Sequence, residues 1–249
     1  MQVVVDDLLT AYEQSGHGKV VLLLHGWGDK SAGLKGLQHA LAADHKVIAP
    51  DLPGFGGTQS PTTVWGLDDY AQFIADFLKK LEIKDLYAVI GHSNGGAIAI
   101  RALSKEIFTT DKLILLASAG LRDVYKGRRK TLRLITKTGK ALTSPLPKSI
   151  KKKLRQKVYE TVGSDMLVAE HLQETFKKVV TDDVQKDATQ IDVPTLLVYG
   201  ENDTATPVWF GEKLHELIDG SMLEILPNAG HFVHLDRPHQ VAKAIQEFL

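Results

Sequence analysis

The chain has 249 residues, of which 43% are hydrophobic and 24% charged, as in typical globular proteins, and this length allows one large α/β domain plus an insertion. It contains no cysteine, which excludes disulfide bonds, thiolate metal ligands and a cysteine nucleophile. No stretch approaches the roughly 20 apolar residues that would span a bilayer, and the N-terminus lacks the basic and apolar regions of a signal peptide, so we expect a cytoplasmic protein without an integral membrane segment.

Strand-length apolar runs alternate with segments of helical periodicity along most of the chain. Two short strands, expected to be antiparallel, come first at Val3–Val5 and Ala11–Gln14. The continuous apolar run Val20–Leu24 is typical of a strand buried on both faces, and similar runs follow at Lys46–Ala49, Leu86–Ile90, Leu113–Ala117, Thr195–Tyr199 and Met222–Leu226. Helices are predicted at Tyr70–Leu81, Ala97–Leu103 and Val241–Leu249. This alternation predicts an α/β fold, with a mostly parallel central sheet and helices on both faces.

The alternation breaks between residues 121 and 191, where the pattern indicates helices without buried strands. We expect a helical lid over 121–191, inserted into a core formed by 1–120 and 192–249. From Arg122 to Lys157 there are fourteen Lys or Arg residues and one acidic residue, Asp123, which leaves a net charge of +13. The simplest interpretation is a set of solvated helix faces. The alternatives are a docking surface for an acidic partner or an anionic membrane surface. Nucleic acid is disfavoured because no recognition motif accompanies the charge.

The sequence Gly91-His92-Ser93-Asn94-Gly95 follows an apolar strand and precedes a helical pattern. This is the context of a nucleophile elbow, in which a sharp strand-to-helix turn exposes the serine above the sheet. Glycines two residues before and after the serine allow the close backbone approach that the turn requires. Ser93 is therefore the candidate nucleophile, at a helix N-terminus that favours developing negative charge.

A serine hydroxyl needs a base to take its proton, and the base needs an orienting carboxylate. His231 follows the last strand and is expected at the same sheet edge as Ser93, whereas His234, the main alternative, is expected to point elsewhere. Asp203 follows the Thr195–Tyr199 strand, with Glu201 as the alternative acid. The order Ser, Asp, His along the chain agrees with the order in this type of active site.

Acyl transfer also needs two backbone N–H donors for the developing oxyanion. One is expected from Asn94, the residue after the nucleophile. The other is expected from Trp27, in the turn that follows the Val20–Leu24 strand, because ligands bind at this end of the strands in α/β sheets. The Trp27 indole is also a candidate for the wall of an acyl pocket.

Five segments together resemble the α/β-hydrolase superfamily over nearly the whole chain. They are HGWG at 25–28, DLPGFGGT at 51–58, GHSNGG at 91–96, GENDTATP at 200–207 and NAGHF at 228–232. Within the superfamily the chain resembles small, lid-bearing carboxylesterases, including the esterases that cleave pimeloyl-carrier-protein methyl ester. In those esterases the residue that matches Trp27 donates its backbone N–H to the oxyanion.

The resemblance implies hydrolysis of a small-molecule ester or thioester through an acyl-enzyme on Ser93, with no metal or organic cofactor. It also makes an acidic carrier protein a candidate partner for the basic segment. Haloalkane dehalogenases and epoxide hydrolases have aspartate at the nucleophile position, so Ser93 argues against both. Two other hypotheses are a serine aminopeptidase, with Glu170 and Glu174 as candidates for binding the substrate ammonium group, and a non-catalytic ligand receptor on the same scaffold.

Overall fold

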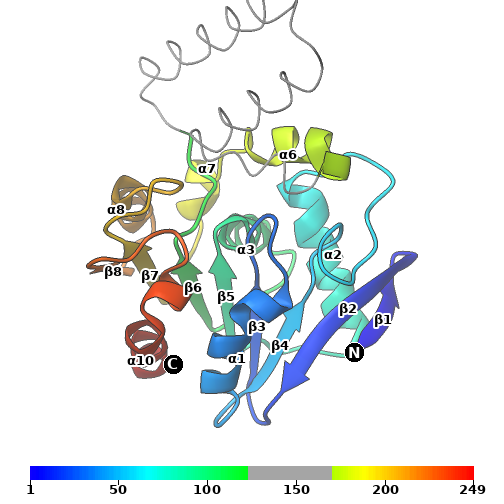
Figure 1. Ribbon diagram of the computed structural model, residues 1–249, viewed down its shortest axis with the longest axis horizontal. Helices are drawn as coiled ribbons and strands as arrows, with labels where there is room; N and C mark the ends of the chain where they lie inside the picture. Colours follow the sequence, from blue (N-terminus) through cyan, green and yellow to red (C-terminus); the bar gives the residue numbers. More distant parts are fainter. Residues whose placement is uncertain (123–169) are drawn as a thin grey trace, which may run out of the picture.

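The computed structural model describes residues 1–122 and 170–249, and their centre is an eight-stranded sheet (Figure 1). The strands lie in the order β1-β2-β4-β3-β5-β6-β7-β8. Strands β1 and β2 are antiparallel to their neighbours, and all the other pairs are parallel. The strands span Gln2–Val5 (β1), Leu8–Ser15 (β2), Val20–Leu24 (β3), Lys46–Pro50 (β4), Ala88–His92 (β5), Lys112–Leu116 (β6), Thr195–Gly200 (β7) and Met222–Leu226 (β8).

The parallel strands are aligned so that their carboxyl ends lie at one edge of the sheet. Leu24 at the end of β3 pairs with Gly91 of β5, and Leu116 at the end of β6 pairs with Val198 of β7. The loops that follow β3, β5, β7 and β8 therefore leave the sheet on the same side. Residues 21–24 of β3 are fully buried, which explains why this strand is a continuous apolar run.

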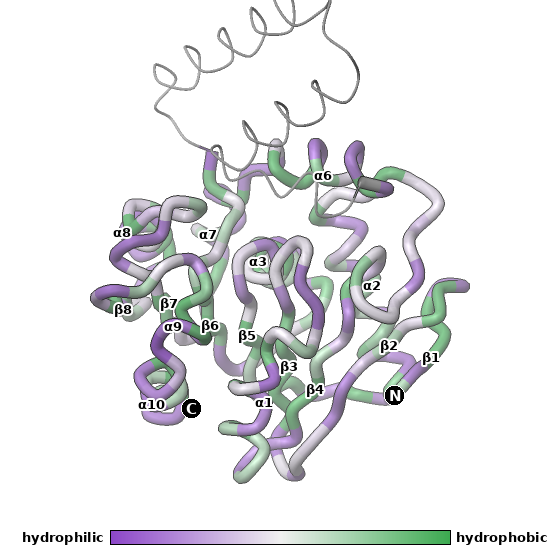
Figure 2. The backbone as a smooth tube through the Cα atoms, in the orientation of Figure 1, coloured by the Kyte–Doolittle hydropathy of each residue, from purple (hydrophilic) through white to green (hydrophobic). Residues whose placement is uncertain are grey.

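Helices cover both faces of the sheet, as the sequence predicts. One face is covered by α2 (Leu67–Lys80), α3 (Asn94–Ser104) and α8 (Val208–Leu217), whose residues Phe77, Ile98 and Leu214 share one apolar core. The other face is covered by α1 (Lys35–Leu41), the 3₁₀ helix η1 (Ser31–Leu34), α9 (Val233–Asp236) and α10 (Pro238–Phe248). Leu37 of α1 and Val241 of α10 belong to a second apolar core on this face. Figure 2 shows hydrophobic residues along the central strands and hydrophilic stretches on the outer helices.

The described part of the expected lid, residues 170–191, lies against the core. It contains η3 (Glu170–Leu172), α6 (Gln173–Val179) and α7 (Gln185–Ala188). Val184 and Ala188 are fully buried, and the Val184 N–H donates to the Gly120 carbonyl over 2.8 Å. Residues 123–169, which hold nearly all of the basic segment, lie outside the described residues, so the division into core and lid stays an expectation.

A partly buried guanidinium joins this segment to two helices of the core. Arg101 of α3 contacts Asp68 of α2 over 2.9 Å and Asp187 of α7 over 3.1 Å, and its side chain is 12% exposed. Lys105, which is 46% exposed, reaches the same Asp68 carboxylate over 2.8 Å. Across 1–122 and 170–249, the helices are all too short or too polar to traverse a bilayer.

Candidate active site

Ser93 occupies a strained turn between β5 and α3. Its φ of 51° and ψ of −115° place it in a region that residues with a side chain rarely adopt. The two flanking glycines permit this turn, because a Cβ on Gly95 would lie 2.3 Å from the Leu24 carbonyl oxygen. A Cβ on Gly91 would lie 2.5 Å from the Gly96 Cα. Backbone packing thus explains why this turn needs glycine at both positions.

A hydrogen-bond chain links the three residues that the sequence predicts as a triad. His231, in the loop after β8, places Nε2 3.0 Å from the Ser93 hydroxyl oxygen. Its Nδ1 lies 2.8 Å from Oδ2 of Asp203, in the loop after β7. Because the carboxylate accepts, the Nδ1–H tautomer leaves Nε2 free to accept the serine proton. The geometry is that of a nucleophile, a base and an orienting acid.

Asp203 is held as an ionised acceptor in a closed environment. Its side chain is fully buried, and Oδ1 accepts the N–H groups of Ala205 over 2.7 Å and Thr206 over 2.9 Å. Burial alone raises the pKa of Asp203, but the hydrogen bonds from His231 and Thr206 outweigh it, so the net pKa lies below the ordinary value. The carboxylate is therefore charged and fixed in orientation.

Thr206 contributes to the site although the sequence analysis gave it no role. Its hydroxyl oxygen lies 2.7 Å from Oδ2 of Asp203, 3.1 Å from Nδ1 of His231 and 3.0 Å from the Ala117 carbonyl oxygen. The sequence signal that could have identified Thr206 is its position three residues after Asp203.

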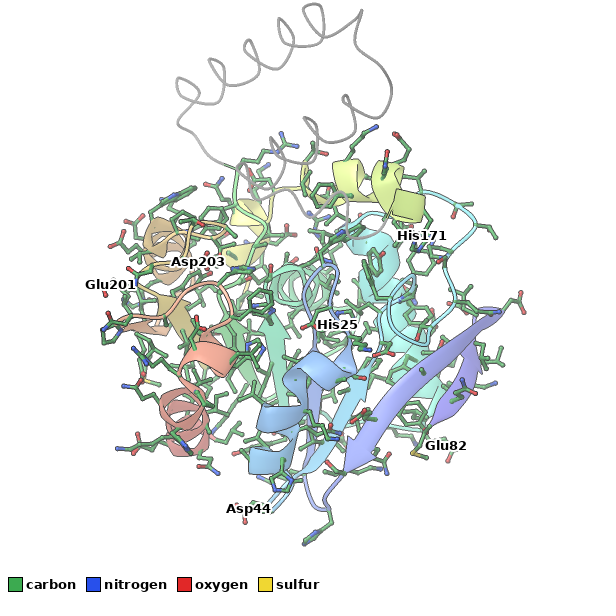
Figure 3. The ribbon with its side chains drawn as sticks, in the orientation of Figure 1. His25, Asp44, Glu82, His171, Glu201 and Asp203 are labelled. Atoms are coloured by element: carbon green, nitrogen blue, oxygen red, sulfur yellow. The ribbon has the colours of Figure 1, made fainter. Side chains whose placement is uncertain are left out.

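The two alternative residues lie outside this chain of hydrogen bonds. Glu201 is exposed and accepts the Asn228 N–H over 3.2 Å, and Figure 3 shows it farther toward the periphery than Asp203. His234 lies on α9, and the hydrogen bonds between Ser93, His231 and Asp203 do not include it. The geometry therefore favours Asp203 and His231 for the acid and base roles.

The loop after β3 packs directly against the nucleophile. A Cβ on Gly26 would lie 3.1 Å from the Ser93 Cβ. Among the described residues, the backbone N–H groups of Trp27 and Asn94 donate no hydrogen bond. Two free donors, one in this loop and one directly after the serine, are what an oxyanion hole requires.

His25, which lies near the centre of Figure 3, holds the shape of the loop after β3 through two hydrogen bonds. Its Nε2 accepts the Leu52 N–H over 2.8 Å, so the ring proton is on Nδ1, which donates to the Gly26 carbonyl over 2.7 Å. Burial lowers the pKa of His25, in agreement with a neutral ring. This histidine thus supports the Trp27 turn without taking part in the hydrogen-bond chain.

Aromatic side chains and an adjoining cleft border the loop. The Trp27 indole contacts Phe55, with ring centroids 4.9 Å apart, and Phe176 of α6, at 5.2 Å. Beside it lies a cleft of about 320 Å³ lined by Gly28, Asp29, Lys30, Gly54, Phe55, Gly56 and His171. A larger groove of about 950 Å³ is formed by α2 and residues 82–86 and includes none of the triad residues, so we do not assign it to the chemistry.

Comparison with known proteins agrees with this architecture. Residues 21–244 match the model of the "Alpha/beta hydrolase family". A 2-hydroxy-6-oxo-6-(2'-aminophenyl)hexa-2,4-dienoic acid hydrolase from Metapseudomonas resinovorans is 28% identical, with 96% of this chain and 87% of that protein aligned. A pimeloyl-[acyl-carrier protein] methyl ester esterase from Nitrosomonas europaea is 25% identical, with 92% and 94% aligned.

Among solved structures, a serine hydrolase involved in carbazole degradation is similar over 100% of this chain and 97% of its own. It has a TM-score of 0.75 and 27% sequence identity. The family match covers far more than half of the chain and includes nearly all of β3, strands β4 to β8 and the candidate site. The chain therefore belongs to the alpha/beta hydrolase family.

Proposed function

We propose that this protein is a serine hydrolase that cleaves carboxylic esters or thioesters, with Ser93 as nucleophile, His231 as base and Asp203 as orienting acid. The observation that carries the proposal is the continuous hydrogen-bond chain from the Ser93 hydroxyl through His231 to the buried Asp203 carboxylate. A carboxylate at Nδ1 and a serine at Nε2 give the imidazole the tautomer that acyl transfer requires.

In the first step the Ser93 oxygen attacks the ester carbonyl carbon while Nε2 of His231 takes the serine proton. The carbonyl oxygen becomes an oxyanion, which the N–H groups of Trp27 and Asn94 stabilise. Asp203 stabilises the imidazolium that forms. The tetrahedral intermediate then collapses, the carbon–oxygen bond to the alcohol breaks, and His231 donates its proton to the departing alcohol.

In the second step His231 removes a proton from water, and the water oxygen attacks the acyl carbon on Ser93. Collapse of the second tetrahedral intermediate breaks the bond to Ser93, releases the acid and returns the proton to the serine oxygen. The proposal needs no metal or organic cofactor, since the protein residues supply the nucleophile, the base and the oxyanion donors.

A second candidate function is hydrolysis of a 2-hydroxy-6-oxo-dienoic acid, and the relative from Metapseudomonas resinovorans is the observation that favours it. The name of that substrate contains a ketone and no ester. In contrast, the aminopeptidase hypothesis loses support, because the carboxylate of Glu174 is exposed and paired with Lys177. The side chain of Glu170 is outside the described residues.

We further propose that residues 121–191 form a lid over the site and that its basic segment docks an acidic carrier protein. Charge supports the docking proposal, with +13 between Arg122 and Lys157, as does the relative that acts on an acyl-carrier-protein ester. An electrostatic docking surface predicts that turnover of carrier-linked esters weakens with salt, while turnover of small esters does not.

The test of the main proposal is turnover of p-nitrophenyl esters from acetate to laurate by the wild-type protein and by Ser93→Ala. We expect turnover by the wild type and none above background by the folded variant. The acyl length of the ester that is turned over fastest indicates the length of the acyl pocket. Wild-type turnover by Ser93→Ala would refute the nucleophile assignment. Turnover of the dienoic acid but of no ester would establish the second candidate instead.

A further inference from the structure

His92, the residue before the candidate nucleophile, bonds to the candidate base. It ends strand β5, is 1% exposed, and its Nε2 lies 3.0 Å from the carbonyl oxygen of His231. The two residues are 139 positions apart in the chain, so this contact joins the nucleophile turn to the loop after β8. A structural or surface role was expected of His92 from the sequence, as of the other histidines outside the triad, with no indication of this partner.

The surroundings of His92 fix which nitrogen carries its proton. A carbonyl oxygen only accepts, so Nε2 must be the protonated nitrogen. The other nitrogen, Nδ1, is buried without a partner among the described residues. Burial is the main cause that holds the pKa of His92 well below its usual range, and the nearby His234 and His231 lower it further. His92 is therefore a neutral Nε2–H donor at physiological pH.

His92 also touches the loop that carries a candidate oxyanion donor. A Cβ on Gly26 would lie 3.0 Å from Nδ1 of His92 and 3.1 Å from the Cβ of Ser93. On its other side the His92 ring packs against the rings of His231, at 5.0 Å between centroids, and of Phe232, at 5.2 Å. The His92 side chain thus packs against both the loop after β3 and the loop that carries His231.

The rest of the base loop is held from a different direction. Asn202 donates to the Ala229 carbonyl over 2.8 Å, and Gly230 donates to Asp236 over 2.7 Å. These bonds tie the base loop to the loop after β7 and to α9. The bond from His92 ties the peptide of His231 itself to the strand that ends at the nucleophile.

We infer that His92 is a positioning residue, which sets the distance between Ser93 and His231 by donating Nε2–H to the carbonyl of His231. The inference rests on the proposed function of this site. Hydrolytic catalysis depends on such distances, because a misplacement of about 1 Å costs on the order of 10²-fold in rate.

The test compares His92→Met with His92→Gln. Both side chains have about the length of histidine. Only glutamine keeps a donor, because its amide nitrogen is the same number of bonds from the backbone as Nε2 of histidine. On the best p-nitrophenyl ester we expect His92→Met to lower kcat by roughly tenfold to 10²-fold with KM within about twofold, and His92→Gln to restore most of kcat. His234→Met is the matched control, because it alters a neighbouring ring, 4.8 Å from His92, that does not bond to His231.

Thermal unfolding and titration of Ser93 with a fluorophosphonate show how much of each variant is folded and competent. Wild-type kcat in folded His92→Met, or an equal loss in His92→Gln, would overturn the inference. Turnover by Ser93→Ala would instead refute the proposed function, which makes the two failures distinct.

A measurement on the wild-type protein covers the case in which the variants do not fold. Ring-nitrogen NMR shifts of ¹⁵N-labelled histidine report the tautomer and charge of each ring. We expect His92 to be neutral with its proton on Nε2 from about pH 5.5 to 8, well within the range where an ordinary histidine titrates. A proton on Nδ1, or a charged ring at pH 7, would overturn the inference.

Discussion

Replacement of Asp203 by asparagine tests the proposed action of Asp203 on His231, and the surroundings of Asp203 determine how the new amide would lie. Oδ1 accepts two backbone N–H groups, from Ala205 and Thr206, so the amide oxygen must take that position. The amide NH₂ then occupies the position of Oδ2 and faces Nδ1 of His231, which lies 2.8 Å away. An NH₂ donor stabilises the tautomer whose proton is on Nε2, and that nitrogen can no longer accept the proton of Ser93.

We expect Asp203→Asn to lower kcat by about 10⁴-fold, which corresponds to about 5 kcal/mol of activation free energy. The assay is steady-state turnover of the best p-nitrophenyl ester near pH 7, together with the rate at which a fluorophosphonate labels Ser93. Glu201→Gln is the matched control, since within residues 1–122 and 170–249 its carboxylate bonds only to the Asn228 N–H, and the change should leave kcat nearly unaltered. A loss of less than about tenfold in Asp203→Asn would refute the tautomer argument, and a large loss in Glu201→Gln would identify Glu201 as the acid.

Three further predictions concern the framework of the site. In urea unfolding, Gly95→Ala should destabilise the protein by several kcal/mol, because the new Cβ would lie 2.3 Å from a backbone oxygen. Gly36→Ala, whose Cβ would have nothing within 4 Å, should be neutral or should stabilise helix α1 by up to about 1 kcal/mol. Arg101→Met should lower the free energy of unfolding by about 1–3 kcal/mol, because it leaves Asp187, whose side chain is 15% exposed, without its guanidinium partner. Lys105→Met should cost less than about 1 kcal/mol, because the Lys105 and Asp68 side chains are 46% and 54% exposed; equal losses would contradict this. Since the fold lowers the pKa of Asp203, its charge stabilises the fold above the ordinary aspartate pKa of about 3.9, and that contribution is lost as the pH falls through the lowered pKa. The stability of wild type relative to Asp203→Asn should therefore be constant at neutral pH and decline in acid unfolding, and a gain on acidification would refute the assignment.

Several strands were predicted well from the sequence, as apolar runs of strand length. The Met222–Leu226 run agrees with β8, and the Val20–Leu24 run agrees with β3. The prediction for β5, Leu86–Ile90, is displaced by two residues, because the strand is Ala88–His92. Its last two residues, Gly91 and His92, pair with β6 in the ladder although neither has a strong strand preference, so a local pattern could not include them.

Helix ends and short helices were harder to predict, because tertiary contacts decide them. Helix α2 begins at Leu67 instead of the predicted Tyr70, and the Asp69 carboxylate accepts the Gly66 N–H over 2.6 Å at this end. Helix α8 contains Gly211, which weakens its helical pattern. A Cβ there would lie 2.6 Å from the ring of Tyr199, so close packing on β7 explains the glycine.

The candidate site shows the same division between local and long-range information. Ser93, Asp203 and His231 stand in short motifs after apolar strands, and the structure brings them into one hydrogen-bond chain. His92 lies within one of those motifs and His25 within the HGWG segment, yet each also bonds to a residue far along the chain, His92 to His231 and His25 to Leu52. No local pattern indicates such partners, so their parts in the site required the structure.

The most direct test of the central claim is to identify the residue that carries the acyl group during turnover. The wild-type protein is mixed with a p-nitrophenyl ester, quenched in acid within the first turnover, and analysed by intact mass and peptide mass spectrometry. We predict a mass increase of one acyl group, located on Ser93 and absent from Ser93→Ala. Turnover with the acyl group on another residue, or turnover with no acyl-enzyme in a quench fast enough to capture one, would contradict the account.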